Sequence, residues 1–204
     1  MLTHGTRQRP RLRRSGGMTL IELLVTIVLL AVLLMLAMSS FQNWTRNAQV
    51  RTVSDALQNG LRMAQAESVR RSRQVVFFLT DAAQCDATTA PAANGAFWAM
   101  RTVALFSGDA TQTLQCGQVL DRNSGSVLIG GPTAICFNSM GRQVANPSPG
   151  AGSATCTVTA GGTSRYDVSH PQANRPLRVL VSMGGQVRMC DPARTIAASP
   201  DGCP

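Results

Sequence analysis

The segment that most constrains this chain is an apolar run near its N-terminus that is interrupted by one acid. The 18 residues from Ile21 to Met38 contain no lysine, arginine, proline or glycine. At about 1.5 Å per residue, a helix of this length crosses a bilayer. Glu22 is the only charge in the run. A carboxylate in hydrocarbon costs about 2.5 kcal/mol or more near the bilayer centre and is usually paired or functional. We therefore expect a membrane helix in which Glu22 has a specific role.

The residues before this run are basic and predict its orientation. They include Arg7, Arg9, Arg11, Arg13 and Arg14. By the positive-inside rule, these charges hold the N-terminal end in the cytoplasm. Two alternatives stay open. One is a secretory signal peptide cut near residues 37–39, although such a peptide has no use for an acid at the head of its apolar region. The other is a simple single-span anchor.

The residues from Gly17 to Val25 resemble the class III signal of type IV pilins and pseudopilins. The resemblance implies that a prepilin peptidase removes the leader, residues 1–17, and that Met18 becomes a methylated N-terminus. It also implies that Glu22, the fifth residue of the mature chain, pairs with the N-terminal amine of a neighbouring subunit during assembly. Opposite charges in hydrocarbon relieve each other's desolvation only at the correct axial stagger.

Removal of the leader changes both the size and the charge of the protein. Of the 204 residues, 17 would be lost and 187 kept, enough for one membrane helix and one modest domain. The formal net charge of +9, less the five leader arginines, falls to +4. The high pI therefore overstates how basic the exported surface is, and by itself it is a weak argument for nucleic-acid binding.

Six cysteines lie beyond the apolar run, in the part expected outside the cytoplasm. An even number in an oxidising compartment predicts three disulfides. Many pairings are open, and we expect the sequential one because each bridge then closes a loop rich in Gly, Pro and Ala. The expected pairs are Cys85–Cys116, Cys136–Cys156 and Cys190–Cys203. No C-x-x-C motif occurs, which argues against zinc and thiol–disulfide chemistry. No metal or cofactor is predicted.

The helix is expected to continue past the membrane, because no proline interrupts residues 18–73. Residues 18–41 would lie in lipid or a fibre core, and residues 42–73 would pack one face on a globular head, residues 74–204. On that face, small and apolar residues recur at spacings of three and four. They are Val50, Val53, Leu57, Leu61, Ala64 and Ser68, with Arg51, Asp55, Asn59 and Arg62 on the opposite side.

Beyond Arg73 the pattern becomes that of strands, rich in β-branched and aromatic residues. Glycine supplies turns at 139–141 and 183–185, and linker-like stretches lie at 86–95 and 146–154. The fold class is predicted as α+β, type IV pilin-like, with the long helix packed on a mainly antiparallel sheet. We expect strands at 74–79, 96–106, 117–121, 126–130, 133–138, 142–145, 155–159, 177–182 and 185–190.

Two further segments narrow the resemblance. Residues 61–76, in which the helix ends in an acid and a short basic run before the first strand, resemble the GspH/FimT minor pilins. Residues 184–192 resemble the closing strand of FimT- and FimU-like minor pilins. Many pilins have a proline where this chain has Ser39, so a kink at that position stays open.

The residues of the mature chain predict no enzymatic activity. His170 is the one histidine of the mature chain and stands in a loop. The motifs of serine hydrolases, zinc proteases and P-loop proteins do not occur. Three arginines at 70, 71 and 73 are explained by the helix dipole, which favours positive charge at a helix C-terminus.

A possible DNA-binding set is the remaining candidate. Arg188 stands where FimT-like proteins carry the last arginine of a G-R-x-R motif that is linked to DNA, but Gln186 replaces the first. Arg178 and Arg194 lie nearby in the sequence. These residues predict either a phosphate-binding patch or a solvated strand face.

The sequence as a whole predicts a non-enzymatic minor pilin that helps initiate or cap a type IV pilus. It would sit in the bacterial inner membrane, single-pass, with its head in the periplasm. Its expected partners are other minor and major pilins, the prepilin peptidase and the assembly platform. A minor pseudopilin of a type II secretion system, GspH-like, has the same architecture. A pilus-borne DNA receptor for natural transformation is a third alternative, and the residues do not separate the three.

Overall fold

The computed structural model describes residues 17–121 and 126–204, without the side chains of residues 36, 37, 39 and 40. Apart from Gly17, the predicted leader lies outside the described residues. The chain divides into two compact units between Phe41 and Gln42. We call residues 17–41 the stem and residues 42–204 the head.

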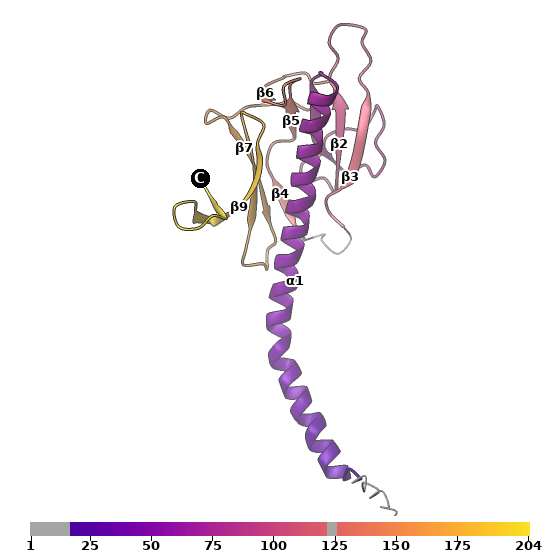
Figure 1. The fold of residues 1–204 in the computed structure, drawn as a ribbon. Helices are drawn as coiled ribbons and strands as arrows, with labels where there is room; N and C mark the ends of the chain where they lie inside the picture. The colour runs from indigo at the N-terminus through magenta and orange to yellow at the C-terminus, as the bar shows by residue number, and fades with distance from the viewer. Residues whose placement is uncertain (1–16, 122–125) are drawn as a thin grey trace, which may run out of the picture. The chain divides into compact units, whose positions relative to one another are not determined.

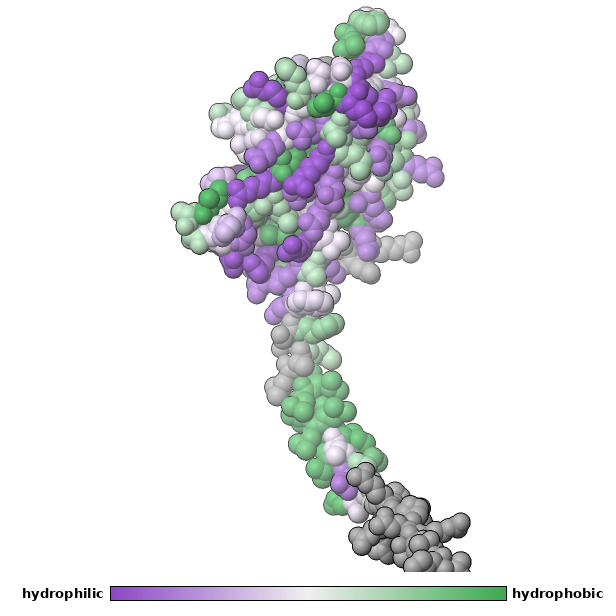
Figure 2. Space-filling view, viewed as in Figure 1, coloured by the Kyte–Doolittle hydropathy of each residue, from purple (hydrophilic) through white to green (hydrophobic). Residues whose placement is uncertain are grey.

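One long helix, α1, runs from Leu20 to Arg70 and contains 51 residues. It is unbroken at Ser39, where a kink had been left open. Every side chain from Gly17 to Met35 is exposed, and Figure 2 shows the hydrophobic surface of this part of the helix. Among the described residues, no helix has both the length and the hydropathy that a membrane crossing requires.

The head portion of α1 buries the predicted stripe. All six of its members, from Val50 to Ser68, are fully buried, whereas Arg51, Asn59 and Arg62 are exposed. The helix then closes with a left-handed residue, Ser72, whose φ is 52°. The amide of Arg73 donates to the carbonyl of Ser68 at 3.1 Å, and that of Ser72 donates to Val69 at 3.1 Å. This is a Schellman closure, which satisfies the last carbonyls and turns the chain into the first strand.

Two five-stranded sheets complete the head, and the head part of α1 lies against them and shares a core with both (Figure 1). The first sheet has the order β3-β2-β1-β5-β6, and the second has the order β10-β9-β8-β7-β4. All neighbours are antiparallel except β10, which pairs parallel with β9. The strands are β1 (Val75–Thr80), β2 (Phe97–Thr102), β3 (Thr113–Gln118), β4 (Leu128–Gly130), β5 (Ala134–Phe137), β6 (Gln143–Val144), β7 (Thr163–Ser169), β8 (Leu177–Ser182), β9 (Val187–Thr195) and β10 (Gly202–Cys203).

The first sheet is covered on both faces. Along β1 every residue is buried, with Phe77 in the main core beside α1 and Phe78 in a second core on the other face. The second sheet shows the alternation of a sheet with one wet face. On β7, Tyr166 and Val168 belong to the main core, while Arg165 is exposed on the opposite face. The fold class is therefore α+β, as the sequence predicts.

Three disulfides join the sequential pairs Cys85–Cys116, Cys136–Cys156 and Cys190–Cys203. The first two contribute to the second core, which lies under the loops that precede β2 and follow β6. The third links β9 to β10, so that the last described residues fold back on the second sheet. No cysteine among the described residues is free.

Both predicted hairpin turns are confirmed. Gly141 has a φ of 74° and Gly185 a φ of 88°, conformations that side chains disfavour. The two turns also meet, because a Cβ on Gly185 would stand only 1.8 Å from the carbonyl oxygen of Gly141. Glycine is therefore required at Gly185 for two reasons.

Several strand predictions are wrong. Residues 155–159 form only isolated bridges through Cys156. The strand expected at 117–121 is observed at Thr113–Gln118. It ends there because the amides of Val119 and Leu120 leave the ladder and both donate to the carbonyl of Ala96. Strand β7 was missed because serine occupies an inward position, Ser164, where it accepts a hydrogen bond from the side chain of Gln143. The last long strand extends to Thr195, beyond the predicted end at residue 190.

The close packing of β3 on Trp98 yields a test of this fold. A Cβ on Gly117 would stand 2.6 Å from the indole ring of Trp98, which is itself packed on Phe77 with centroids 5.9 Å apart. We expect Gly117→Ala to lower the free energy of unfolding by about 1–3 kcal/mol. Gly130→Ala is the matched control in β4, since its nearest atom would be 3.9 Å away. Urea unfolding followed by circular dichroism measures both, and equal midpoints would contradict the packing.

Candidate processing and assembly site at the start of the helix

The predicted cleavage residues lie just before the first turn of α1. Gly17 and Met18 precede the helix, and Met18 is 64% exposed. A Cβ on Gly17 would have no heavy atom within 4 Å. The peptide bond between these two residues is therefore outside the helix and uncovered by the rest of the described chain.

Thr19 caps the helix. Its hydroxyl oxygen accepts a hydrogen bond from the amide of Glu22 at 3.3 Å, and its carbonyl accepts one from Leu23 at 3.1 Å. The spacing from Thr19 to Glu22 is that of a capping box, in which a Thr and a Glu three residues later satisfy open amides at a helix start. Sequence reasoning missed this role of Thr19, although the T-x-x-E pattern was visible.

The cap gives Glu22 a local role at the helix start, in addition to the expected pairing with the N-terminal amine of a neighbouring subunit. A carboxylate in the first turn is favoured by the helix dipole by about 0.3–1 kcal/mol. The Glu22 side chain is nevertheless exposed, and it stands four residues from Met18 at the same end of α1. The structure thus brings Gly17, Met18 and Glu22 together at one accessible helix terminus.

The arginines at the other end of α1 have intramolecular partners. The carboxylate of Glu67 pairs with Arg70 at 2.6 Å and with Arg71 at 2.9 Å. These hydrogen bonds, first from Arg70 and then from Arg71, hold the pKa of Glu67 below its ordinary value. Arg73 pairs with Asp109 in the loop between β2 and β3. The cluster therefore stabilises the helix end and attaches the loop to it.

The three candidate DNA-binding arginines do not form one open patch. Arg178 pairs with Asp167 on the neighbouring strand at 2.6 Å. Arg188 donates to the carbonyls of Pro200 and Gly202, both at 3.0 Å.

The third of these arginines, Arg194, contacts the same segment, residues 200–202, as Arg188. Arg194 pairs with Asp201 at 3.0 Å and lies 3.7 Å from Asp191. Arg178 and Arg188 share the outer face of the second sheet, because the register sets Arg188 opposite Leu180, two residues along from Arg178. Each has a structural role in this conformation.

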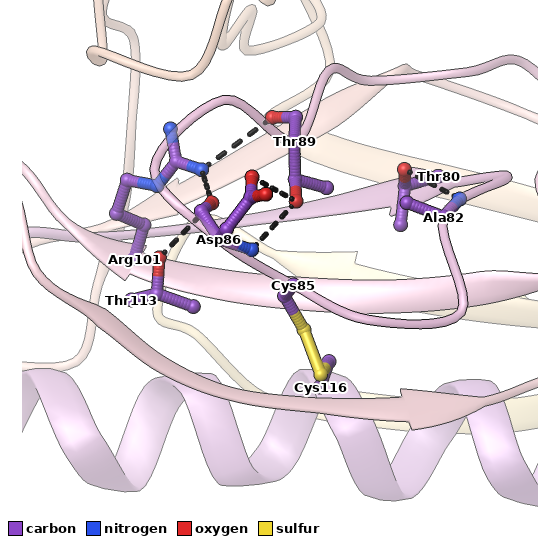
Figure 3. The surroundings of a disulfide bond; sticks show 8 residues. All are labelled: Thr80, Ala82, Cys85, Asp86, Thr89, Arg101, Thr113 and Cys116. Atoms are coloured by element: carbon purple, nitrogen blue, oxygen red, sulfur yellow. Dashed lines mark hydrogen bonds between the residues drawn. A yellow bond between two sulfur atoms is a disulfide. The ribbon is translucent and has the colours of Figure 1, made fainter.

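Sequence reasoning also missed Arg101, a buried cation on β2. It is 2% exposed, and its guanidinium donates to the carbonyls of Asp86 at 2.7 Å and Gly150 at 3.1 Å. It also lies 5.6 Å from the ring centre of Phe78. Figure 3 shows Arg101 reaching the loop that carries Cys85. Burial lowers the pKa of Arg101, while the charge of Asp86 raises it. One side chain thus holds two glycine- and alanine-rich loops over the second core.

Metal-binding groups and the lone loop histidine were both candidates for chemistry. No group of three or more His, Cys, Asp or Glu residues is placed to hold a metal ion within 17–121 and 126–204. The Nδ1 atom of His170 accepts a hydrogen bond from the amide of Gln172 at 3.1 Å, a turn contact. Burial raises the pKa of Tyr166, which keeps its hydroxyl protonated.

Two family models match the sequence of this chain, one over the start of α1 and one over most of the head. Residues 12–38 match the prokaryotic N-terminal methylation motif. Residues 53–185, more than half of the chain, match the type II transport protein GspH. The chain belongs to the GspH/FimT family. A comparison with curated proteins gives no match.

Solved structures of two minor fibre subunits resemble this GspH/FimT chain. The type IV minor pilin FimU of Pseudomonas aeruginosa is 13% identical in two crystal forms, with TM-scores of 0.48 and 0.46. The alignments cover 73% and 70% of this chain and 96% of each FimU chain. The minor pseudopilin EpsH of the Vibrio cholerae type 2 secretion system is 8% identical, with a TM-score of 0.44. That alignment covers 72% of this chain and 99% of EpsH.

Membership of the GspH/FimT family bears on the role of the N-terminal segment. Pilins and pseudopilins are structural subunits, and the matched methylation motif covers Gly17, Met18 and Glu22 together. The family match in the head ends at residue 185, before Arg188 and Arg194. The matched methylation motif therefore bears on the helix start, and Arg188 and Arg194 are a separate question.

Proposed function

We propose that this chain is a minor pilin that a prepilin peptidase processes between Gly17 and Met18. Residues 18–41 then anchor it in the bacterial inner membrane, with the head in the periplasm. From there it joins other minor and major pilins through the assembly platform and helps to initiate or cap a type IV pilus. The role is structural and non-enzymatic. The observation that carries the proposal is the exposed Gly17–Met18 bond directly before a Thr19-capped apolar helix.

The anchoring residues support assembly as well as insertion. The exposed stem side chains are almost all aliphatic, and a monomer rarely exposes so large an apolar surface to water. Glu22 is the only charged residue among them. In a packed array of such helices, the carboxylate is relieved of its desolvation only where an amine stands opposite. The amine of Met18 on a neighbouring subunit fulfils that need at one axial stagger.

The second candidate function is a minor pseudopilin of a type II secretion system. The description of the matched family, a type II transport protein, favours it. Deletion of the gene separates the two candidates. Loss of surface pili with normal protein secretion supports the pilin, and loss of secretion with normal pili supports the pseudopilin. Neighbouring genes for pilus or secretion components give the same distinction.

Processing is the first test of this function. We expect the membrane-bound form to begin at Met18 with a methylated amine, because Gly17 and Met18 are exposed ahead of the helix. Intact-mass analysis of protein purified from membranes measures this. A chain that begins at Ser40 would instead identify the segment as a secretory signal peptide and remove the pilin assignment.

Assembly is the second test. Glu22→Ala removes a carboxylate that is expensive in hydrocarbon, so membrane insertion should be unchanged or better. Incorporation into the fibre should fall, because the charge pairing with Met18 is lost. Thr19→Ala is the matched control: it removes the capping hydroxyl, worth about 0.5–2 kcal/mol, and keeps the charge. Immunoblots of sheared fibres and membranes measure both, and normal incorporation of Glu22→Ala would refute the role of this residue.

The DNA-binding alternative rests on Arg178, Arg188 and Arg194, whose internal contacts compete with phosphate. We expect weak binding of duplex DNA. Gln186 is exposed, and Gln186→Arg should raise retention and steepen the slope of log affinity against log salt by about one unit. Asn59→Arg adds the same charge on the exposed side of α1. An equal effect of both substitutions in a salt titration would show a general charge effect and end this alternative.

A further inference from the structure

A groove of about 530 Å³ lies beside the first turns of the head part of α1. The head begins at Gln42, and the helical residues that line the groove lie between Trp44 and Arg51. The volume is within the range of about 300–1,000 Å³ that binding pockets span. Strands β8 and β9 and the loops next to them supply the other walls. We call it the basal groove.

The apolar lining of the basal groove comes from three elements. Trp44 and Ala48 are four residues apart on α1, so they lie on one face of the helix. Leu177 on β8 and Met189 on β9 complete the lining. Trp44 is 67% exposed. Tryptophan is enriched where a protein crosses from lipid to water, because its ring is apolar and its N–H is polar. The groove therefore offers apolar surface to part of a guest, next to a side chain suited to a membrane interface.

Two arginines of the basal groove have distant carboxylate partners. The guanidinium of Arg51 lies 3.9 Å from Asp55, and its side chain is 72% exposed. The guanidinium of Arg175 lies 3.4 Å from Asp191, and its side chain is 54% exposed. A close charge-assisted hydrogen bond is about 2.7–2.9 Å long, and each guanidinium has several N–H donors. Both arginines can therefore donate to an anionic guest.

The exposed acid of the basal groove, Asp201, already has a positive partner. Its carboxylate pairs with Arg194 at 3.0 Å and accepts a hydrogen bond from the hydroxyl of Ser199. The hydrogen bond from Ser199 is the main reason why the pKa of Asp201 lies below its ordinary value. The side chain is 51% exposed, and a carboxylate accepts several hydrogen bonds. Asp201 can therefore accept from a hydroxyl of a guest. The groove as a whole suits an amphiphile with an anionic group, a hydroxyl donor and an apolar chain.

The place of the groove in the chain points to a lipid as this amphiphile. Trp44 follows Met38, the last residue of the apolar run, by less than about two helical turns. The headgroup layer of a bilayer extends about 5–7 Å beyond the hydrocarbon core on each side. In the proposed function, residues 18–41 lie in the inner membrane. The first residues of the head then meet the headgroups of the periplasmic leaflet, and this step rests on the proposed function.

We propose that the basal groove binds one anionic phospholipid, phosphatidylglycerol, from the periplasmic leaflet. The phosphodiester lies between Arg51 and Arg175, and the hydroxyls of the headgroup donate to Asp201. The glycerol end of one acyl chain lies along Leu177 and Met189. Phosphatidylcholine has the same phosphate, but its headgroup has no hydroxyl and carries a quaternary ammonium that the two arginines repel. A bound phosphatidylglycerol fixes the orientation of the head on the membrane before the subunit leaves for a fibre.

Photo-crosslinking of the membrane-purified chain tests this site. The protein is reconstituted in phosphatidylcholine nanodiscs that contain a small fraction of phosphatidylglycerol with a diazirine near the glycerol end of one acyl chain. We expect links to peptides that contain Leu177 or Met189, in addition to the links that any surrounding lipid makes along the stem. The same diazirine on phosphatidylcholine should give roughly tenfold fewer links at Leu177 and Met189, the scale of one hydrogen bond to a charged group. Equal yields from the two lipids, or no links at these residues, would overturn the proposal.

A charge variant provides the second arm. Arg51→Gln removes one phosphate ligand at an exposed position, so the fold is kept, and the yield at Leu177 and Met189 should fall roughly tenfold. Arg46→Gln is the matched control. It removes the same charge from the same helix, on the side away from the groove, about 200° from Trp44. Its yield should stay unchanged, and an equal loss in both variants would reduce the effect to general attraction of anionic lipid and refute a specific site.

A variant that fills the groove provides the third arm. Ala48→Phe keeps Arg51 and Arg175 but places a ring among the lining residues, so the links at Leu177 and Met189 should be lost. Ala56→Phe is its control, since Ala56 is also half-buried on α1 but does not line the groove. Thermal unfolding followed by circular dichroism checks that both chains are folded. A folded Ala48→Phe chain with the original yield would contradict binding in the groove.

The N-terminus of the purified chain separates this inference from the proposed function. If the chain begins at Met18 but Leu177 and Met189 give no links, the pilin function stands and the lipid site is wrong. If the chain begins at Ser40, the pilin function is wrong, and the same photoreactive lipid is used in vesicles of phosphatidylcholine and phosphatidylglycerol. Links at Leu177 and Met189 then support the lipid site without the pilin function, and their absence refutes both.

Discussion

Burial of one face of α1 against residues of both sheets is the contact on which the head depends. Val53, Leu57 and Leu61 have no exposed surface, and they share a core with residues of both sheets. Each such side chain contributes about 1.5–3 kcal/mol by leaving water. Since the helix and the first sheet share this core with the inner face of the second sheet, the outer face of the second sheet can stay polar. The first sheet lacks that option, because its outer residues, such as Phe78, are also apolar.

Disulfides and hydrogen bonds from Arg101 hold the loops that cover that outer face. The loops over it are rich in alanine, glycine and proline, so they bring few side chains that could form a core by themselves. Two disulfides, Cys85–Cys116 and Cys136–Cys156, tie them down, each contributing about 3 kcal/mol in the loop-entropy account. Arg101 adds a fixed donor set that joins the two loops through backbone carbonyls. A lysine has no comparable planar fork, which explains why arginine suits this position.

The sequence predicted those elements whose signal is local. The stripe on α1, the glycine turns at 141 and 185 and most of the strands are local patterns, and the structure has them. The errors have non-local causes. Ser164 is buried because Gln143, 21 residues away in the chain, donates to it. Arg101 looked like any other arginine of a strand, since its carbonyl partners belong to loops on both sides of it in sequence. The Thr19 cap was a local signal that the apolar run obscured.

The number of arginines says little about the function of this chain. Arg73, Arg101, Arg178 and Arg188 all make internal contacts, so a basic composition here reflects how loops and strands are joined. Large apolar side chains are instead exposed all along the stem, from Leu20 to Met35. All buried residues of both cores lie beyond Phe41. Substitutions at Glu22 therefore leave every core contact of the head in place, and a change in fibre incorporation can be attributed to the stem alone.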